Sequence, residues 1–173
     1  MSVVAEPFRD QFAVDEVSPA HRVFEWHIVE ANARVAHLVG ASTRGVPGIG
    51  KAGDAWKDGL NLNADRYLKT PAVFGFHGGY KRLAHGLGVV DEDLYLGDAG
   101  YRLLKAWEED QNLHGFSDHT SREGEGPLMR MRWQEALKES MKKGATVRTN
   151  GWGGWRRMVE HLRVDQIGLQ ERR

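Results

Sequence analysis

Residues 64–110 constrain the fold more than any other stretch, because signals for helices, turns and strands follow one another there in close succession. Val89-Val90 and Leu94-Tyr95-Leu96 are β-prone and flank the acidic run 91–93, which predicts a tight hairpin of two strands. A short helix that ends at a pair of glycines is predicted before the hairpin from apolar residues at helical spacing, namely Tyr80, Leu83, Ala84 and Leu87.

Further helices are predicted on both sides of this unit. Asp98 suits the N-cap of a helix that continues to about Asp110, with an apolar stripe along it. Upstream, Ala64–Lys69 is expected to form the first helix of a helix-turn-helix. The turn should lie near Thr70, because a residue before proline is pushed out of the helical region. We expect the core beneath the motif to contain Phe74, Phe76 and Tyr80.

The order of helix, glycine break, acidic hairpin and helix resembles the winged-helix domains of bacterial transcription regulators. The matching residues are Lys81-Arg82-Leu83, Gly86-Leu87-Gly88-Val89-Val90, Leu94, Leu96, Gly100 and Leu103-Leu104. The resemblance covers about a quarter of the chain and implies a winged helix-turn-helix there. Domains of this kind also serve as protein–protein modules, so the resemblance leaves the function open.

The composition limits the reactions that the protein can perform and indicates its cellular compartment. There is no cysteine, which excludes disulfides, zinc ribbons and thiol catalysis and is typical of a reducing cytoplasm. The first residues, MSVVAEPFRDQF, contain three charges and no apolar core of signal-peptide length, and no window has the length and apolar character of a membrane span. We therefore expect a cytoplasmic protein with no membrane partner.

Charge is distributed unevenly, although the formal net charge is zero. Residues 1–128 contain 13 Lys and Arg against 19 Asp and Glu, whereas residues 129–173 contain 11 against 5. The basic C-terminal third favours an anionic partner such as nucleic acid. Attraction to the acidic part of the chain, or to another protein, is the alternative.

The chain is long enough for two small lobes. We expect an N-terminal arm over residues 1–17, a helical lobe with the winged helix-turn-helix over 18–112, a polar linker over 113–126 and a basic helical lobe over 127–173. The predicted fold class is mainly α, with a β-hairpin wing and a second small basic helical lobe.

Three helices outside the central unit follow from their start and stop signals. Ser18-Pro19 begins a long helix that reaches Val39. In the basic lobe, one helix is expected from Pro127 to about Lys143, closed by Gly144, and another from Trp155 onward.

Basic and amide side chains near the two predicted recognition helices are the candidate DNA contacts. Lys81 and Arg82, together with His77, lie on the second helix of the central motif, where Arg and Lys pair with guanine edges or phosphates. A second helix-turn-helix-like outline in the basic lobe adds Arg148, Asn150, Arg156 and Arg157. A solvated basic face is the alternative for both groups.

Two motifs that resemble ligand sites fail on their chemistry. Residues 45–51 have the G-x-x-x-x-G-K spacing of a phosphate-binding loop, but Ala52 lacks the hydroxyl that holds magnesium, and a helix is predicted where a strand is required. A His and acid cluster in the linker lacks the one-face geometry of a helical metal motif: His114, Asp118, His119 and Glu123. We predict no cofactor, no metal site and no catalytic residue, and rank an enzyme third.

Two binding functions remain. The leading prediction is a protein that binds double-stranded DNA, with phosphates neutralised by the basic third and base edges contacted from the Lys81-Arg82 helix. The acidic run 91–93 would repel DNA at the tip of the wing. The alternative is therefore an adaptor in a multi-subunit complex, with a protein partner at the acidic wing and no direct DNA contact.

Overall fold

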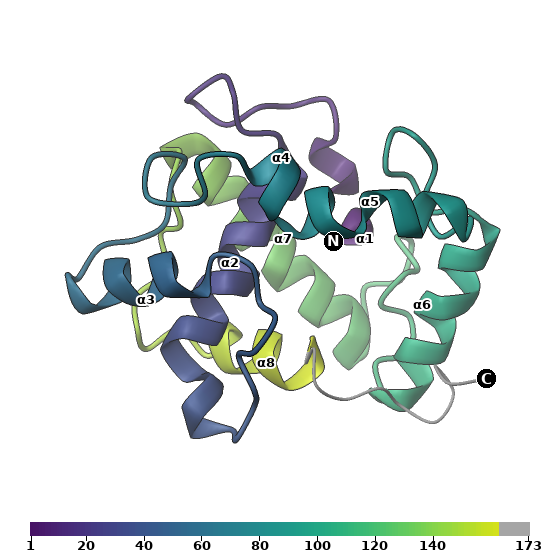
Figure 1. Ribbon diagram of the computed structural model, residues 1–173. Helices are drawn as coiled ribbons and strands as arrows, with labels where there is room; N and C mark the ends of the chain where they lie inside the picture. Colours follow the sequence, from purple (N-terminus) through teal and green to yellow (C-terminus); the bar gives the residue numbers. More distant parts are fainter. Residues whose placement is uncertain (163–173) are drawn as a thin grey trace.

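The computed structural model describes residues 1–162, and Figure 1 shows how its helices are arranged. In chain order the elements are α1 (Ser2–Ala5), η1 (Glu6–Phe8), α2 (Ala20–Val35), η2 (Ala36–Leu38), α3 (Ile49–Lys57), α4 (Pro71–Phe74), α5 (Phe76–Gly86), α6 (Asp98–Asp110), α7 (Glu125–Lys143) and α8 (Gly154–His161); η1 and η2 are 3-10 helices. No helix within the described residues combines the length and apolar character that a membrane span needs.

Helix α2 lies at the centre of the fold, and 12 of its 16 residues are buried. The helices α1, α3, α7 and α8 pack against it, and α2 occupies the middle of the view in Figure 1. Trp26 of α2, Trp133 of α7 and Trp155 of α8 are all buried. Helices from both ends of the described chain therefore share one hydrophobic core.

Four predicted helices are confirmed with small shifts at their ends. The helix expected from Ser18-Pro19 to Val39 is α2 followed by η2, and α6 spans its predicted range. The two helices expected in the C-terminal part are α7 and α8. Gly144 ends α7 in a left-handed conformation with φ 66°, and its N–H donates to the Ser140 carbonyl at 2.8 Å.

The predicted mainly α class is confirmed, but the winged helix is wrong, because residues 1–162 contain no β-strand and thus no wing. The second basic helical lobe stays a prediction. The chain does reverse after Asp91, but Val90 and Leu96 form a single bridge pair instead of two strands. Asp91 provides the reason: its Oδ1 accepts the N–H groups of Asp93 at 3.0 Å and Tyr95 at 2.8 Å. These amides are satisfied within the turn, so they do not pair across strands.

The predicted first helix of the motif, Ala64–Lys69, is also not helical. Asn63 Oδ1 accepts the N–H of Arg66 at 2.9 Å, which bends the chain into a turn. Tyr67 is buried, and its hydroxyl donates to Glu25 Oε1 on α2 at 2.6 Å. Burial, reinforced by the Glu25 carboxylate, raises the pKa of Tyr67, so the hydroxyl stays a donor. This contact holds the connection between α3 and α4 against α2.

A buried polar network joins α2 to two loops. Glu30 accepts the N–H of Leu62 at 3.1 Å and the hydroxyl of Thr146. Arg34 Nε donates to Glu30 at 2.8 Å, and its Nη2 donates to Asn61 Oδ1 at 3.0 Å. The Thr146 N–H completes the arrangement by donating to the Leu62 carbonyl at 2.9 Å. The segments before α4 and after α7 are thereby fixed to the same side of α2.

The predicted linker 113–126 is held by α6 and α7. The Arg130 guanidinium is buried and donates to the carbonyl oxygens of Gly115, Phe116, Asp118 and Ser121. From the other side, Glu108 on α6 accepts the N–H of Ser117 at 2.6 Å. One of the positive charges of the basic third is thus used inside the protein.

Candidate functional site

None of the described side chains of the helices α4 and α5 is buried. Tyr80, Leu83 and Leu87 follow one another at spacings of three and four, so they lie on one side of α5. With two neighbours on α4 they form what we call the apolar face; the exposed fractions are Val73 55%, Phe74 66%, Tyr80 53%, Leu83 60% and Leu87 62%. Such a group of exposed large apolar side chains makes this face a candidate binding surface.

Glu25, buried on α2, fixes the beginning of α5. Its Oε1 accepts the N–H of Phe76 at 3.0 Å, so a carboxylate satisfies one of the free amide donors at the helix start and complements the helix dipole. A side chain at Gly75 would collide with the Glu25 carboxylate and the Pro71 carbonyl. Glycine is therefore required between α4 and α5. Glu25 thus attaches the first turn of α5 to α2.

The charged residues in the sequence span that carries the apolar face are all basic. No Asp or Glu occurs between Asp65 and Asp91, whereas Lys69, Lys81 and Arg82 fall within this span. Lys81 and Arg82 are both exposed, and neither forms an ion pair within residues 1–162. An occupant with carboxylates beside apolar groups would complement this surface.

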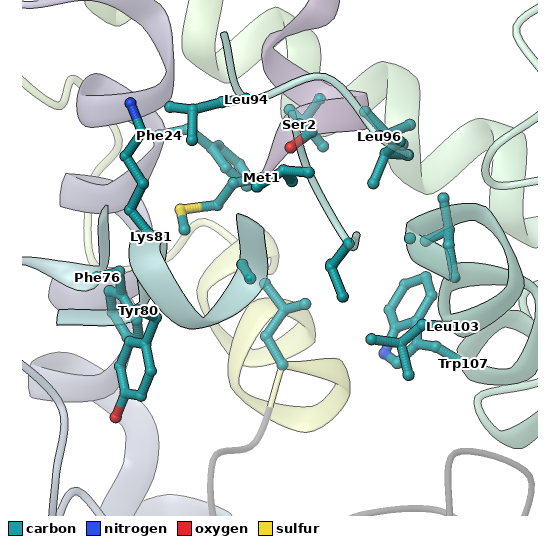
Figure 2. A pocket seen from close by; sticks show the side chains of 18 of the residues that line it. Met1, Ser2, Phe24, Phe76, Tyr80, Lys81, Leu94, Leu96, Leu103 and Trp107 are labelled. Atoms are coloured by element: carbon teal, nitrogen blue, oxygen red, sulfur yellow. The ribbon is translucent and has the colours of Figure 1, made fainter. Parts of the chain in front are cut away.

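Beneath α5 lies an apolar cleft of about 350 Å³. Its walls come from α1, α2, α5, α6, α7 and the turn between α5 and α6, with Phe116 and Leu162 completing them. Figure 2 shows Phe24, Leu96, Leu103 and Trp107 among the side chains around it. The Trp107 N–H is directed to the His161 carbonyl at 3.0 Å, so it adds no free donor to the cleft. What the cleft offers a ligand is chiefly apolar surface.

Arg148 and Asn150, two of the predicted DNA contacts, form side-chain contacts within the chain, although Asn150 itself is exposed. Arg148 Nη2 lies 3.1 Å from Glu139 Oε2, and its guanidinium lies 5.3 Å from the centre of the Trp152 ring. Asn150 Oδ1 accepts a hydrogen bond from Arg34. Both side chains therefore stabilise the region between α7 and α8.

Arg156 and Arg157 are exposed on α8 and paired with carboxylates. Arg156 Nε lies 2.7 Å from Glu160 Oε1, and Arg157 Nη2 lies 3.1 Å from Glu125 Oε1. Glu160 is already counted among the five acids of residues 129–173, so only Glu125 adds a carboxylate from outside the C-terminal third.

The structure does not unite the two groups of predicted contacts. Lys81 and Arg82 lie on α5, whereas Arg156 and Arg157 lie on α8, and Figure 1 shows the two helices well apart. The remaining candidate on α5, His77, has a side chain outside the described part of the structure.

The two motifs rejected at the sequence level lie away from the apolar face. Gly48 of the glycine-rich loop is left-handed, with φ 76°, and it precedes α3 and contacts the Tyr67 ring. His119 Nε2 in the linker lies 2.8 Å from Glu6 Oε2. Within residues 1–162 no three His, Asp or Glu side chains are grouped so that they could hold a metal ion.

The sequence interpretation missed the exposure of the apolar face. It placed Phe74 and Tyr80 in the core, yet both are more than half exposed, and only Phe76 of the expected set is partly buried. One available signal was the acid-free span 66–90, because basic and apolar residues without any carboxylate are typical of a surface that binds an anionic or acidic partner.

Comparison of the chain with models of protein families, with curated proteins and with solved structures gave no match.

Proposed function

We propose that the protein is an interaction module that binds another protein through the apolar face of α4 and α5. The observation that carries this proposal is the exposure of five large apolar side chains on two helices whose described side chains are not buried. Burial of a fully exposed side chain of this kind releases about 1.5–3 kcal/mol, and these side chains, 53–66% exposed, can contribute the part of it that their exposed surface represents. The function is thus that of an adaptor.

The charges beside the apolar face define the partner. Lys81 and Arg82 would lie at the rim of an interface centred on Leu83 and Leu87. A partner segment with apolar side chains at helical spacing and Asp or Glu beside them would complement both properties. We therefore expect an acidic amphipathic helix as the bound element.

A library of displayed peptides tests this without a known partner. Selection on the wild-type protein is expected to enrich acidic amphipathic helices. The double variant Leu83→Asp/Leu87→Asp should weaken the selected peptides at least about tenfold, a loss of about 1.4 kcal/mol or more. Leu38→Asp is the matched control, because Leu38 is 70% exposed in η2 and lies outside the apolar face. Its affinity should equal that of the wild type.

Two results would reject the adaptor function. One is enrichment of the same peptides by the wild type and by the aspartate double variant, which would mean that binding does not use the apolar face. The other is a dimer that dissociates when Leu83 and Leu87 are changed, measured by sedimentation equilibrium, because a second copy of the chain would then cover the surface.

Binding to double-stranded DNA is the second candidate, and it is favoured by Lys81 and Arg82, which are exposed and form no ion pair within residues 1–162. The exposed apolar side chains beside Lys81 and Arg82 make this face less polar than typical DNA-binding surfaces. We therefore rank DNA below a protein partner. Electrophoretic shift of random duplex across a salt series tests it. A shift that weakens with salt and is lost in Lys81→Glu/Arg82→Glu, with no peptide selected, would reverse the ranking.

A further inference from the structure

The apolar cleft beneath α5 has one wall that the core holds in place. Val4, Phe24, Phe116 and Trp133 line it and are themselves at most 4% exposed. Side chains packed this closely keep their positions, so the wall has a defined shape. The volume of about 350 Å³ falls within the range of about 300–1,000 Å³ that is typical of small-molecule sites. The cleft is therefore large enough for a ligand of moderate size.

The charge of the lining selects among apolar ligands. Lys81 is the one charged side chain among the described lining residues, and no carboxylate lines the cleft. Figure 2 shows its aliphatic stem running beside the other lining side chains to an ammonium at their edge, whereas the Tyr80 hydroxyl points away from them. The stem adds apolar surface, and the ammonium has no ion-pair partner within residues 1–162.

A ligand that satisfies both parts of this site has a long apolar body and one negative end. We propose that the cleft binds a long-chain monocarboxylate such as a fatty acid, with its chain between α5 and α6 and its carboxylate at the Lys81 ammonium. The Lys81 ammonium matches a single carboxylate. Met1 also lines the cleft, and burial lowers the pKa of its α-amino group to about 6, so this group adds little positive charge at neutral pH and a more highly charged headgroup stays under-compensated. Tyr80 and Lys81 border both the cleft and the apolar face, whereas Leu83 and Leu87 do not line the cleft, so changes at these two leucines separate the two sites.

Titration calorimetry with laurate below its micelle concentration tests the site. We expect saturable binding to one site per chain. Dodecylamine has the same alkyl chain with a positive end, and it should bind at least about tenfold more weakly because Lys81 repels it. No binding of laurate, or equal affinity for laurate and dodecylamine, would overturn the proposal.

Charge reversal provides the decisive comparison. Lys81→Glu should weaken laurate at least about tenfold and reverse the preference, so that dodecylamine binds more tightly than laurate. Arg82→Glu changes the net charge equally at the next position of α5, but Arg82 does not line the cleft, so laurate should bind it as the wild type. Equal losses in both variants would show general attraction to the basic span and would overturn the proposal.

A variant whose side chain fills the cleft tests whether the ligand binds there. Ala84 lines the cleft on α5, and Ala84→Trp should abolish laurate binding, whereas Ala72→Trp on exposed α4 should leave it unchanged. Circular dichroism of both variants establishes that they are folded. Leu83→Asp/Leu87→Asp should retain laurate even where it loses peptides, which separates this site from the apolar face. Retention of laurate by the folded Ala84→Trp variant would overturn the proposal.

Vesicles distinguish a free fatty acid from a membrane lipid. Phosphatidylcholine vesicles, with and without phosphatidylglycerol, are sedimented with the protein. We expect the protein to stay in the supernatant while monomeric laurate still binds. Binding to vesicles without binding to monomeric laurate would refute a free monocarboxylate as the ligand.

Discussion

Arg34 and Glu30 form an ion pair in which both side chains are buried, with 6% and 2% of their surfaces exposed. The carboxylate also accepts the Leu62 N–H and the Thr146 hydroxyl, and the guanidinium donates to Asn61. The guanidinium further lies 5.2 Å from the centre of the Trp155 ring. Arg34→Met keeps much of the side-chain volume but leaves the Glu30 charge buried without its cation.

Removal of one partner from a buried ion pair costs about 3–5 kcal/mol, because the remaining charge stays desolvated. We expect Arg34→Met to lower the free energy of unfolding by this amount. For a chain of this length each kcal/mol shifts Tm by about 2–4 °C, so Tm should fall by about 6–20 °C. Urea unfolding followed by circular dichroism measures the free energy, and an unchanged m-value shows that the folded state stays compact.

Arg156→Met is the matched control. Arg156 pairs with Glu160 at the same helical spacing of four, but its side chain is 69% exposed. Exposed pairs at this spacing contribute about 0.3–0.5 kcal/mol, so Tm should change by about 2 °C or less. Losses below about 1 kcal/mol for both variants would refute the assignment of Glu30 and Arg34 as the buried link between α2 and its loops.

Two further changes test the core and the helix packing. Burial lowers the pKa of His27 from 6.5 to about 4, so the unfolded chain binds a proton that the folded chain lacks. The His27 contribution to stability should be complete above pH 6.5 and fall by about 1.4 kcal/mol per unit toward pH 4. In urea titrations His27→Gln should reduce this slope, and the remainder includes His161, whose pKa burial also lowers. Gly100→Ala meets the Val89 carbonyl and should cost about 1–3 kcal/mol, whereas Gly79→Ala enters open space and should stabilise α5 by about 0.5–1 kcal/mol; equal effects would contradict the close packing of α6.

The helices that the sequence predicted correctly carry their signals locally. In α7 the apolar residues recur at helical spacing, and Gly144 supplies the left-handed residue that ends the helix. The prediction of the wing was wrong for a local reason as well. The Asp91 carboxylate accepts the N–H groups of Asp93 and Tyr95, which strand pairing would otherwise use. That competition depends on the rotamer of one side chain, which β-propensity does not describe.

The candidate contacts divide according to how far away their partners lie in the chain. The pairing of Arg156 with Glu160 follows from spacing alone, whereas Glu125, which pairs with Arg157, is 32 positions upstream. Asn150 meets Arg34 across 116 positions. A charge count over the C-terminal third therefore overestimated the free positive charge there.

The sequence by itself determined the main helices, the absence of cysteine chemistry and the acid-free basic span around Lys81 and Arg82. Only the tertiary structure decided which apolar side chains remain outside the core. Trp26, Trp133 and Trp155 fill the interior around α2, whereas Leu83 and Leu87 are 60% and 62% exposed. The physical reason is that helical periodicity shows that a helix has an apolar side, whereas burial of that side depends on partners brought from distant parts of the chain.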